Sequence, residues 1–211
     1  IAWASNRGES FQIIQKLSSG LGDETPLQRS ETPLNPHNSS PDGRFLLYDR
    51  LDPKTQQDLW LLPLGGEGKP TPFLQTPFNE RRGRFSPDGH WVVYDADDQG
   101  HDEVYVQTFP ASGGKWQIST NGGSYPQWRG DGKEIFYISA DNKLMAVEVK
   151  LESALSAGVP KVLFDLAPLR LFRSSFAASA TGDRFLFVRR SQTAAALQYN
   201  VFTNWTAEAK K

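Results

Sequence analysis

A short motif, Ser-Pro-Asp-Gly, recurs along the chain, and a run of aromatic and aliphatic residues follows each copy. Two copies are intact, in residues 40–48 and 86–94, and two are worn, in residues 129–137 and 180–188. The aligned glycines are Gly43, Gly89, Gly132 and Gly182, at intervals of 46, 43 and 50 residues. Self-similarity at such a period indicates a fold that repeats one small structural unit along the chain.

Each unit carries the pattern of four antiparallel strands. In the motif, proline presets φ, aspartate caps the turn and glycine tolerates a positive φ, so the motif predicts a tight turn between two strands. The apolar run that follows, as in residues 91–94, is continuous, which is typical of a strand covered on both faces. An alternating strand, as in residues 104–109, and a shorter fourth strand complete the unit. The pattern predicts an all-β fold, a β-propeller of four-stranded antiparallel blades.

The repeat divides a single domain into about five blades or part-blades. The predicted units are a part-blade in residues 1–34, blades in residues 35–76, 81–120 and 124–166, a part-blade in residues 167–205 and a polar tail in residues 206–211. The first part-blade lacks its innermost strand and the last lacks its outermost, which would leave sheet edges open. We therefore expect a larger ring and a longer protein.

Two further expectations follow from the alignment of the repeats. Eight large residues should occupy equivalent, buried places in successive blades. They are Phe45, Leu47, Trp91, Val93, Ile135, Tyr137, Phe185 and Phe187. The segment with the strongest, though weak, helical character is residues 151–158.

Composition excludes several classes of function. The 211 residues carry a net charge of −1, so we expect no bulk attraction to nucleic acid or to a membrane surface. No apolar stretch approaches the length of a membrane span. The sequence contains no cysteine, which rules out disulfides, thiolate metal ligands and a cysteine nucleophile within it.

Motifs for catalysis or metal binding are mostly missing. The three histidines, His37, His90 and His101, lack the spacing of a zinc site. There is no Gly-x-Ser-x-Gly elbow and no phosphate-binding glycine loop. Four aspartates in residues 95–102 resemble the start of a calcium loop, but the twelfth position is Val106 instead of glutamate. We predict no catalytic residue, no metal and no cofactor, with calcium at the acidic hairpin as the alternative.

The segments that lead into the first strand of each blade should line the central channel of the propeller. Residues 35–38, 79–84, 124–129 and 169–174 carry six arginines and one acid. Arginine forks recognise carboxylates and phosphates, so this excess favours a protein, a peptide or a small anionic ligand in the channel. The predicted ligand-binding residues are Arg81, Arg82, Tyr125, Gln127 and Arg173. In the alternative, the arginines pair with aspartates of neighbouring Asp-Gly turns or are solvated at the rim.

The pattern of residues 85–94, followed by the polar hairpin at Gly100 and by residues 104–106, resembles the WD-like propeller repeat of the TolB family. A closer likeness links several segments to the C-terminal propeller of bacterial membrane-anchored serine/threonine protein kinases of the acidobacterial type. These segments are residues 103–109, 113–119, 132–137, 143–147 and 204–207. The resemblance implies a sensor or interaction module in the periplasm or elsewhere outside the cytoplasm. The resemblance also implies that a kinase domain would lie upstream of the propeller. These residues themselves contain no Gly-rich loop, His-Arg-Asp or Asp-Phe-Gly motif.

The preferred hypothesis is a non-catalytic propeller that binds a ligand or a protein. Two alternatives remain. One is an accessory propeller that filters substrates for a prolyl-oligopeptidase-type peptidase, and the other is a propeller hydrolase such as a glycosidase or lactonase. A glycosidase needs paired carboxylates that face the channel, and Glu80 is nearly alone there.

Overall fold

The structure is a computed structural model of the 211-residue chain. It describes residues 1–7, 10–65, 68–151, 155–169, 171–189 and 198–203. In residues 172–175, 189 and 198–203 only the backbone is described. The predicted tail, residues 206–211, lies outside the described residues.

The strands form five antiparallel sheets in chain order. The first sheet contains β1 (Ala2–Ser5), β2 (Phe11–Gln15) and β3 (Thr25–Ser30). The second contains β4 (Leu34–Ser39), β5 (Phe45–Asp52), β6 (Gln56–Pro63) and β7 (Thr71–Leu74). The third contains β8 (Glu80–Phe85), β9 (Trp91–Ala96), β10 (Glu103–Thr108) and β11 (Lys115–Gln117).

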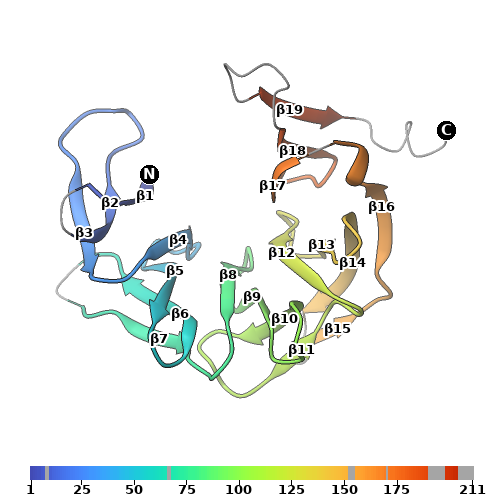
Figure 1. The fold of residues 1–211 in the computed structure, drawn as a ribbon, viewed down its shortest axis with the longest axis horizontal. Coiled ribbons are helices and arrows are strands. Elements are labelled where there is room, and N and C mark those ends of the chain that lie inside the picture. The colour runs from blue at the N-terminus through green and yellow to red at the C-terminus, as the bar shows by residue number, and fades with distance from the viewer. Residues whose placement is uncertain (8–9, 66–67, 152–154, 170, 190–197, 204–211) are drawn as a thin grey trace.

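The fourth sheet contains β12 (Gly123–Trp128), β13 (Glu134–Ser139), β14 (Lys143–Leu151), β15 (Leu155–Ala157) and β16 (Lys161–Asp165). The fifth contains β17 (Leu171–Ala178), β18 (Arg184–Arg189) and β19 (Gln198–Thr203). Figure 1 shows the sheets side by side around an open arc, with β4, β8, β12 and β17 toward its centre. The predicted all-β propeller architecture is confirmed, and the described residues do not close a ring.

The Ser-Pro-Asp-Gly motif forms the turn that joins the first two strands of a sheet. The Ser40 hydroxyl donates to Asp42 Oδ1 at 2.5 Å and accepts from the backbone N–H of Phe45 at 3.0 Å. Gly43 has φ +70°, a left-handed conformation that glycine adopts without steric cost. The second copy repeats the same hydrogen bonds from Ser86. The local reading of the motif is therefore confirmed.

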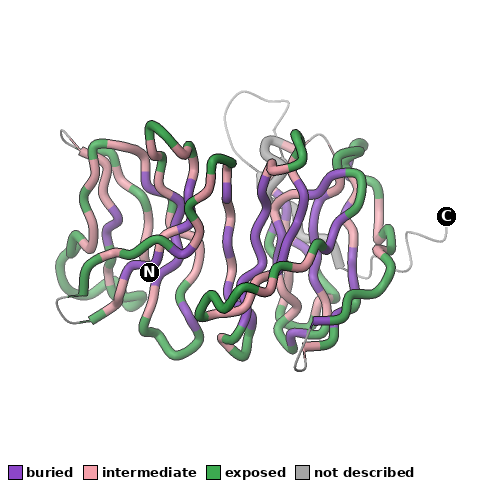
Figure 2. The backbone as a smooth tube through the Cα atoms, turned by 90° about the horizontal axis from the view of Figure 1, so that it is seen from below, coloured by how far each residue is buried: buried purple, intermediate pink, exposed green. Residues whose placement is uncertain are grey.

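Four apolar clusters form the core, one between each pair of neighbouring sheets. The second and third strands of each complete sheet contribute most of the clustered residues, and every residue of β9 is buried. Buried backbone runs through the middle of the sheets in Figure 2, whereas the loops at both ends are exposed. Seven of the eight residues predicted at equivalent positions are at most 6% exposed. Phe45 is the exception, because it is only half-buried.

Residues 151–158 have weak helical character in the sequence, but their described part forms no helix, so this prediction is wrong there. Leu155–Ala157 form β15, which pairs with the end of β14 through Leu151 and Leu155. Residues 152–154 lie outside the described residues. A 3₁₀ turn at Ala167–Leu169 is the only helical element in the described part of the chain. No helix among those residues is long and apolar enough to cross a membrane.

Candidate functional site

The inner strands of four sheets share an irregularity that shapes the face toward the centre of the arc. The pairing register shifts between Pro36 and Asn38 in β4, and between Arg81 and Arg84 in β8. It shifts again between Ser124 and Gln127 in β12, and in the corresponding part of β17. A bulge of this kind redirects side chains, and bulges are common beside binding sites.

Two of the bulge residues have left-handed backbones. Arg82 has φ 56° and Tyr125 has φ 57°, a region that costs energy for residues other than glycine. In both cases the backbone N–H donates to an aspartate of the preceding sheet. Arg82 N lies 3.1 Å from Asp49 Oδ1, and Tyr125 N lies 2.9 Å from Asp95 Oδ2. Asp49 and Asp95 occupy equivalent places, six residues after Gly43 and Gly89, so one contact between sheets is built twice.

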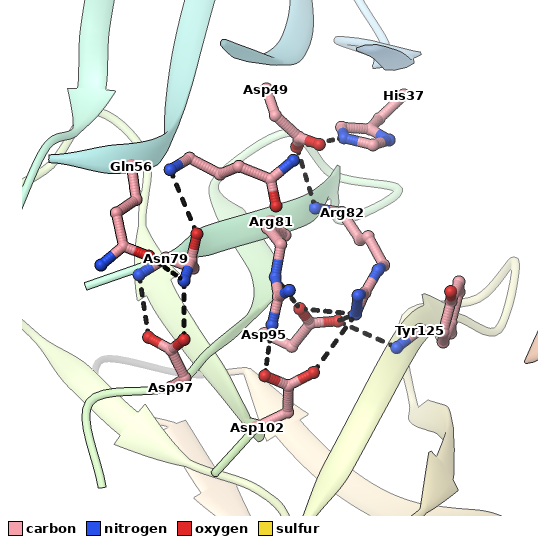
Figure 3. A network of polar contacts seen from close by, with 11 residues as sticks. His37, Asp49, Gln56, Asn79, Arg81, Arg82, Asp95, Asp97, Asp102 and Tyr125 are labelled. Carbon is pink, nitrogen blue, oxygen red and sulfur yellow. Dashed lines mark hydrogen bonds and ion pairs between the residues drawn. The ribbon is translucent and has the colours of Figure 1, made fainter. Parts of the chain in front are cut away.

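The side chains of Arg81 and Arg82 are both paired with carboxylates, as Figure 3 shows. The Arg82 guanidinium donates through Nη1 to both oxygens of Asp95, at 2.7 and 2.9 Å. Arg81 donates through Nη2 to Asp102 and lies 3.7 Å from Asp95 through Nε. Burial raises the pKa of Asp95 to about 6, although the charge of Arg82 opposes that rise. The two arginines therefore already have counterions.

These groups border a cavity of about 350 Å³ on the inner side of the arc. Its walls come from the second to the fifth sheet. They are formed by Asn35, His37, Asp49, Gln57, Arg81, Arg82, Arg84, Tyr125, Pro126, Gln127 and Phe176. The His37 ring contacts Asp49 Oδ1 through Nε2. The cavity thus combines charged groups of both signs with an aromatic and apolar wall.

Arg84 differs from the other arginines of this cavity. No carboxylate lies within salt-bridge distance of its guanidinium among the described residues, and no hydrogen bond engages that group there. Burial alone lowers its pKa, without an acid to oppose that shift. A desolvated charge without a partner is costly, so Arg84 is the cation of this cavity that is open to a ligand.

The structure brings four of the five predicted site residues together around the cavity: Arg81, Arg82, Tyr125 and Gln127. Arg173 lies in β17, but its side chain falls outside the described residues. The partners of Arg81 and Arg82 are Asp95 and Asp102, and neither belongs to an Asp-Gly turn. Arg84 also lies in the channel-facing segment 79–84, but it is not among the predicted ligand-binding residues, because spacing along the sequence does not show which arginine of a cluster has a counterion.

Gln127 has a structural role in addition to lining the cavity. Its amide nitrogen donates to the backbone carbonyl of Phe176, and its amide oxygen accepts from the backbone N–H of Ala178 at 3.1 Å. Both groups belong to β17 of the neighbouring sheet. The amide is therefore engaged in holding the fourth and fifth sheets together, and the part of Gln127 in ligand binding stays a prediction.

The acidic hairpin is not arranged as a calcium loop. Asp97 accepts from the backbone and side-chain nitrogens of Asn79, at 2.9 and 2.7 Å. Asp98 accepts from the Tyr105 hydroxyl and from Lys115 Nζ, both at 2.5 Å. Each aspartate of the hairpin thus has its own partner. No group of three or more potential ligands is placed to hold a metal within the described ranges.

A larger hollow of about 940 Å³ lies at the opposite end of the strands, around the Asp-Gly turns. Arg129 is its most buried cation, and it is paired with Asp131 at 2.7 Å and with Glu134 at 2.5 Å. Its other charged groups, from Asp88 to Lys150, are of both signs and mostly exposed. Size alone therefore does not make this hollow a better candidate than the inner cavity.

The chain has the fold of TolB-type propellers. It matches TolB from Acinetobacter baumannii with a TM-score of 0.72 and 16% identity, over 96% of this chain and 48% of that one. A putative 6-phosphogluconolactonase from Bacteroides uniformis matches with a TM-score of 0.57 and 14% identity, over 96% of this chain and 67% of that one. A puromycin-hydrolyzing peptidase from Mycobacterium tuberculosis matches with a TM-score of 0.61 and 15% identity, over 97% of this chain and 37% of that one.

These similarities describe the fold alone, because a TolB protein, a putative lactonase and a peptidase share it. The chain spans about half the length of the TolB structure that it matches. Neither a family model nor a curated protein sequence matches it.

Proposed function

We propose that this propeller is a non-catalytic binding module that takes a small anionic or peptide ligand at the inner cavity. The observation that carries the proposal is the convergence of polar side chains from three sheets on one cavity of about 350 Å³. Volumes of this size suit small molecules and short peptides, and a few placed polar groups among apolar ones give such sites their specificity. The ligand is recognised by charge and shape.

The module belongs, in this proposal, to a larger protein that works outside the cytoplasm, such as a receptor-type serine/threonine kinase. The propeller would supply the sensing surface and another part of that protein the activity. The sequence upstream of Ile1 tests this assignment directly. A kinase domain and a membrane span there would support it, whereas a hydrolase domain in the same protein would favour the accessory peptidase propeller.

Binding is tested by blocking the cavity. Asn35 lines it and is exposed, so Asn35→Trp should fill its mouth with little cost to the fold. The matched control is Glu31→Trp, because Glu31 is exposed and does not line the cavity. Thermal unfolding is followed with a pool of short peptides of differing charge and with a pool of small carboxylates.

At least one of the two pools should raise the unfolding temperature of the wild type and of Glu31→Trp, but not that of Asn35→Trp. Equal shifts in all three proteins would place binding elsewhere. The same proteins are assayed with lactone, glycoside and peptide substrates. Turnover by the wild type that Asn35→Trp abolishes would contradict the proposal and identify a propeller hydrolase.

A further inference from the structure

Two opposite charges face the same inner cavity without contacting each other. Arg84 lines it from β8 and Asp49 from β5, and no salt bridge joins them. Asp49 is 5% exposed at its side chain. Its Oδ1 contacts His37 Nε2 and accepts a hydrogen bond from the backbone N–H of Arg82. No hydrogen bond reaches its Oδ2 from the described residues.

The remaining charges around the cavity cancel. Arg82 is paired with Asp95, and Arg81 with Asp102. Leaving His37 aside, the three arginines are matched in number by three aspartates, namely Asp49, Asp95 and Asp102. A ligand with only negative charge would therefore leave a net negative cavity and an unsatisfied Asp49. A ligand that carries both charges satisfies Arg84 and Asp49 together.

We propose that the cavity binds a zwitterion, a free α-amino acid or a very short peptide, with its carboxylate on Arg84 and its ammonium group on Asp49 Oδ2. This inference rests on the proposed binding function and narrows its ligand class. A guanidinium offers a planar pair of donors to a carboxylate, and a carboxylate oxygen accepts from an ammonium group.

The rest of the cavity suits the same class of ligand. Tyr125, Pro126 and Phe176 give it an apolar wall against which an aliphatic or aromatic side chain can pack. The side-chain amides of Asn35 and Gln57 line it as well and make no hydrogen bond within the described ranges. A volume of about 350 Å³ lies at the small end of ligand sites, which favours an amino acid or a dipeptide over a longer chain.

The experiment begins with calorimetric titration of the 211-residue chain with each standard L-amino acid and with the dipeptide Ala-Phe. The tightest binder is then compared with its carboxamide, which lacks the carboxylate, and with its N-acetyl derivative, which lacks the ammonium group. Each derivative should bind roughly tenfold to a hundredfold more weakly, because each loses a hydrogen bond between charged groups.

Two variants assign the contacts. Arg84→Gln should weaken binding of the parent ligand by roughly tenfold or more and leave binding of the carboxamide unchanged. Asp49→Asn keeps a side-chain oxygen that can accept from Arg82 N. It should weaken binding of the parent ligand and leave binding of the N-acetyl derivative unchanged. If Arg84 or Asp49 had only a structural role, its substitution would weaken the binding of all the ligands alike. Arg44→Gln is the matched control, because Arg44 is 73% exposed at its side chain and lies away from the cavity.

The possible failures are distinguishable. If the N-acetyl derivative binds as tightly as its parent, the proposal of a zwitterionic ligand is overturned and an anion site is left. The proposed function would then stand. The same holds if no amino acid or dipeptide binds while the peptide or carboxylate pool still does. Failure of every probe in both experiments would overturn the proposed function as well.

Discussion

The guanidinium carbon of Arg82 lies 4.0 Å from the centroid of the Tyr125 ring, across the boundary between the third and fourth sheets. Both residues have positive φ, and the carboxylate of Asp95 binds the side chain of one and the backbone N–H of the other. A strained backbone persists only where surrounding contacts hold it. The cluster Arg82–Asp95–Tyr125 is therefore a joint between two sheets as well as a wall of the cavity.

Removal of Arg82 should destabilise the protein. From the sequence alone, removal of Arg81 and Arg82 together is expected to leave the fold intact, and the structure changes this expectation. Arg82→Ala leaves the buried Asp95 without its main partner, which should cost about 3–5 kcal/mol of unfolding free energy. Urea denaturation at a pH well above 6 measures it.

Arg84→Ala is the internal control for that measurement, since Arg84 has no carboxylate partner in the described part of the chain. It should change the unfolding free energy by no more than about 1 kcal/mol. A loss in Arg84→Ala as large as in Arg82→Ala would mean that the pairing of Arg82 with Asp95 is not what stabilises this region.

The stability of the protein should carry a pH dependence from Asp95. Burial raises the pKa of Asp95 to about 6 in the folded state, above its usual value of 3.8. Between these values the folded protein binds a proton that the unfolded chain does not, so this group adds stability as pH falls from about 6 toward 4. The gain is at most about 1.4 kcal/mol per pH unit.

Comparison with Asp95→Asn isolates this effect from the other ionisable groups of the chain. The charged groups that lie nearest to Asp95 are Arg81 and Arg82, and Asp102 lies beside Arg82. The wild type minus variant difference in unfolding free energy, measured in urea from pH 7 to pH 4, should rise as pH falls. A difference that shrinks instead would show that the charge of Arg82 outweighs burial and that the pKa of Asp95 is lowered.

Phe185 should be among the costliest side chains to truncate. It is 0% exposed and makes an edge-to-face contact with Phe136 at 5.1 Å between ring centroids, across the fourth and fifth sheets. Phe185→Ala should cost about 3–5 kcal/mol through lost burial and a cavity. Phe45→Ala, at the equivalent but half-buried position, should cost clearly less. Equal losses in thermal or urea unfolding would contradict this difference in packing.

The turn glycines should stabilise the protein because they adopt a positive φ, and not because a side chain would lack space there. At Gly43, with φ +70°, an added Cβ would meet no atom within 4 Å. Gly43→Ala should therefore cost about 1–2 kcal/mol from backbone strain alone. Gly43→Asn should cost less, since asparagine tolerates this region better. Calorimetric unfolding of the two variants decides, and equal stabilities would argue against a strained turn.

The architecture could be predicted from the sequence because its signals are local. The turn at Ser40, Asp42 and Gly43 is specified by hydrogen bonds and φ preferences within a few residues. The continuous apolar run of β9 predicts a strand buried on both faces, and all six of its residues are buried. Repetition of these signals was enough to indicate a propeller. The weak helical pattern at residues 151–158 did not prevail, because β14 offers hydrogen-bond partners to Leu155–Ala157.

The charge state of the inner cavity was decided by tertiary structure alone. The sequence shows an excess of arginine in the channel-facing segments, but the partners of Arg81 and Arg82 come from β9 and the hairpin after it. The bulge in β8 sets where each of its arginines lies, and the neighbouring sheets set which aspartates lie near them. Arg84 differs from Arg82 in sequence only by two positions. That no described residue is a counterion of Arg84 follows from three-dimensional distances, which the spacing of residues along the chain does not contain.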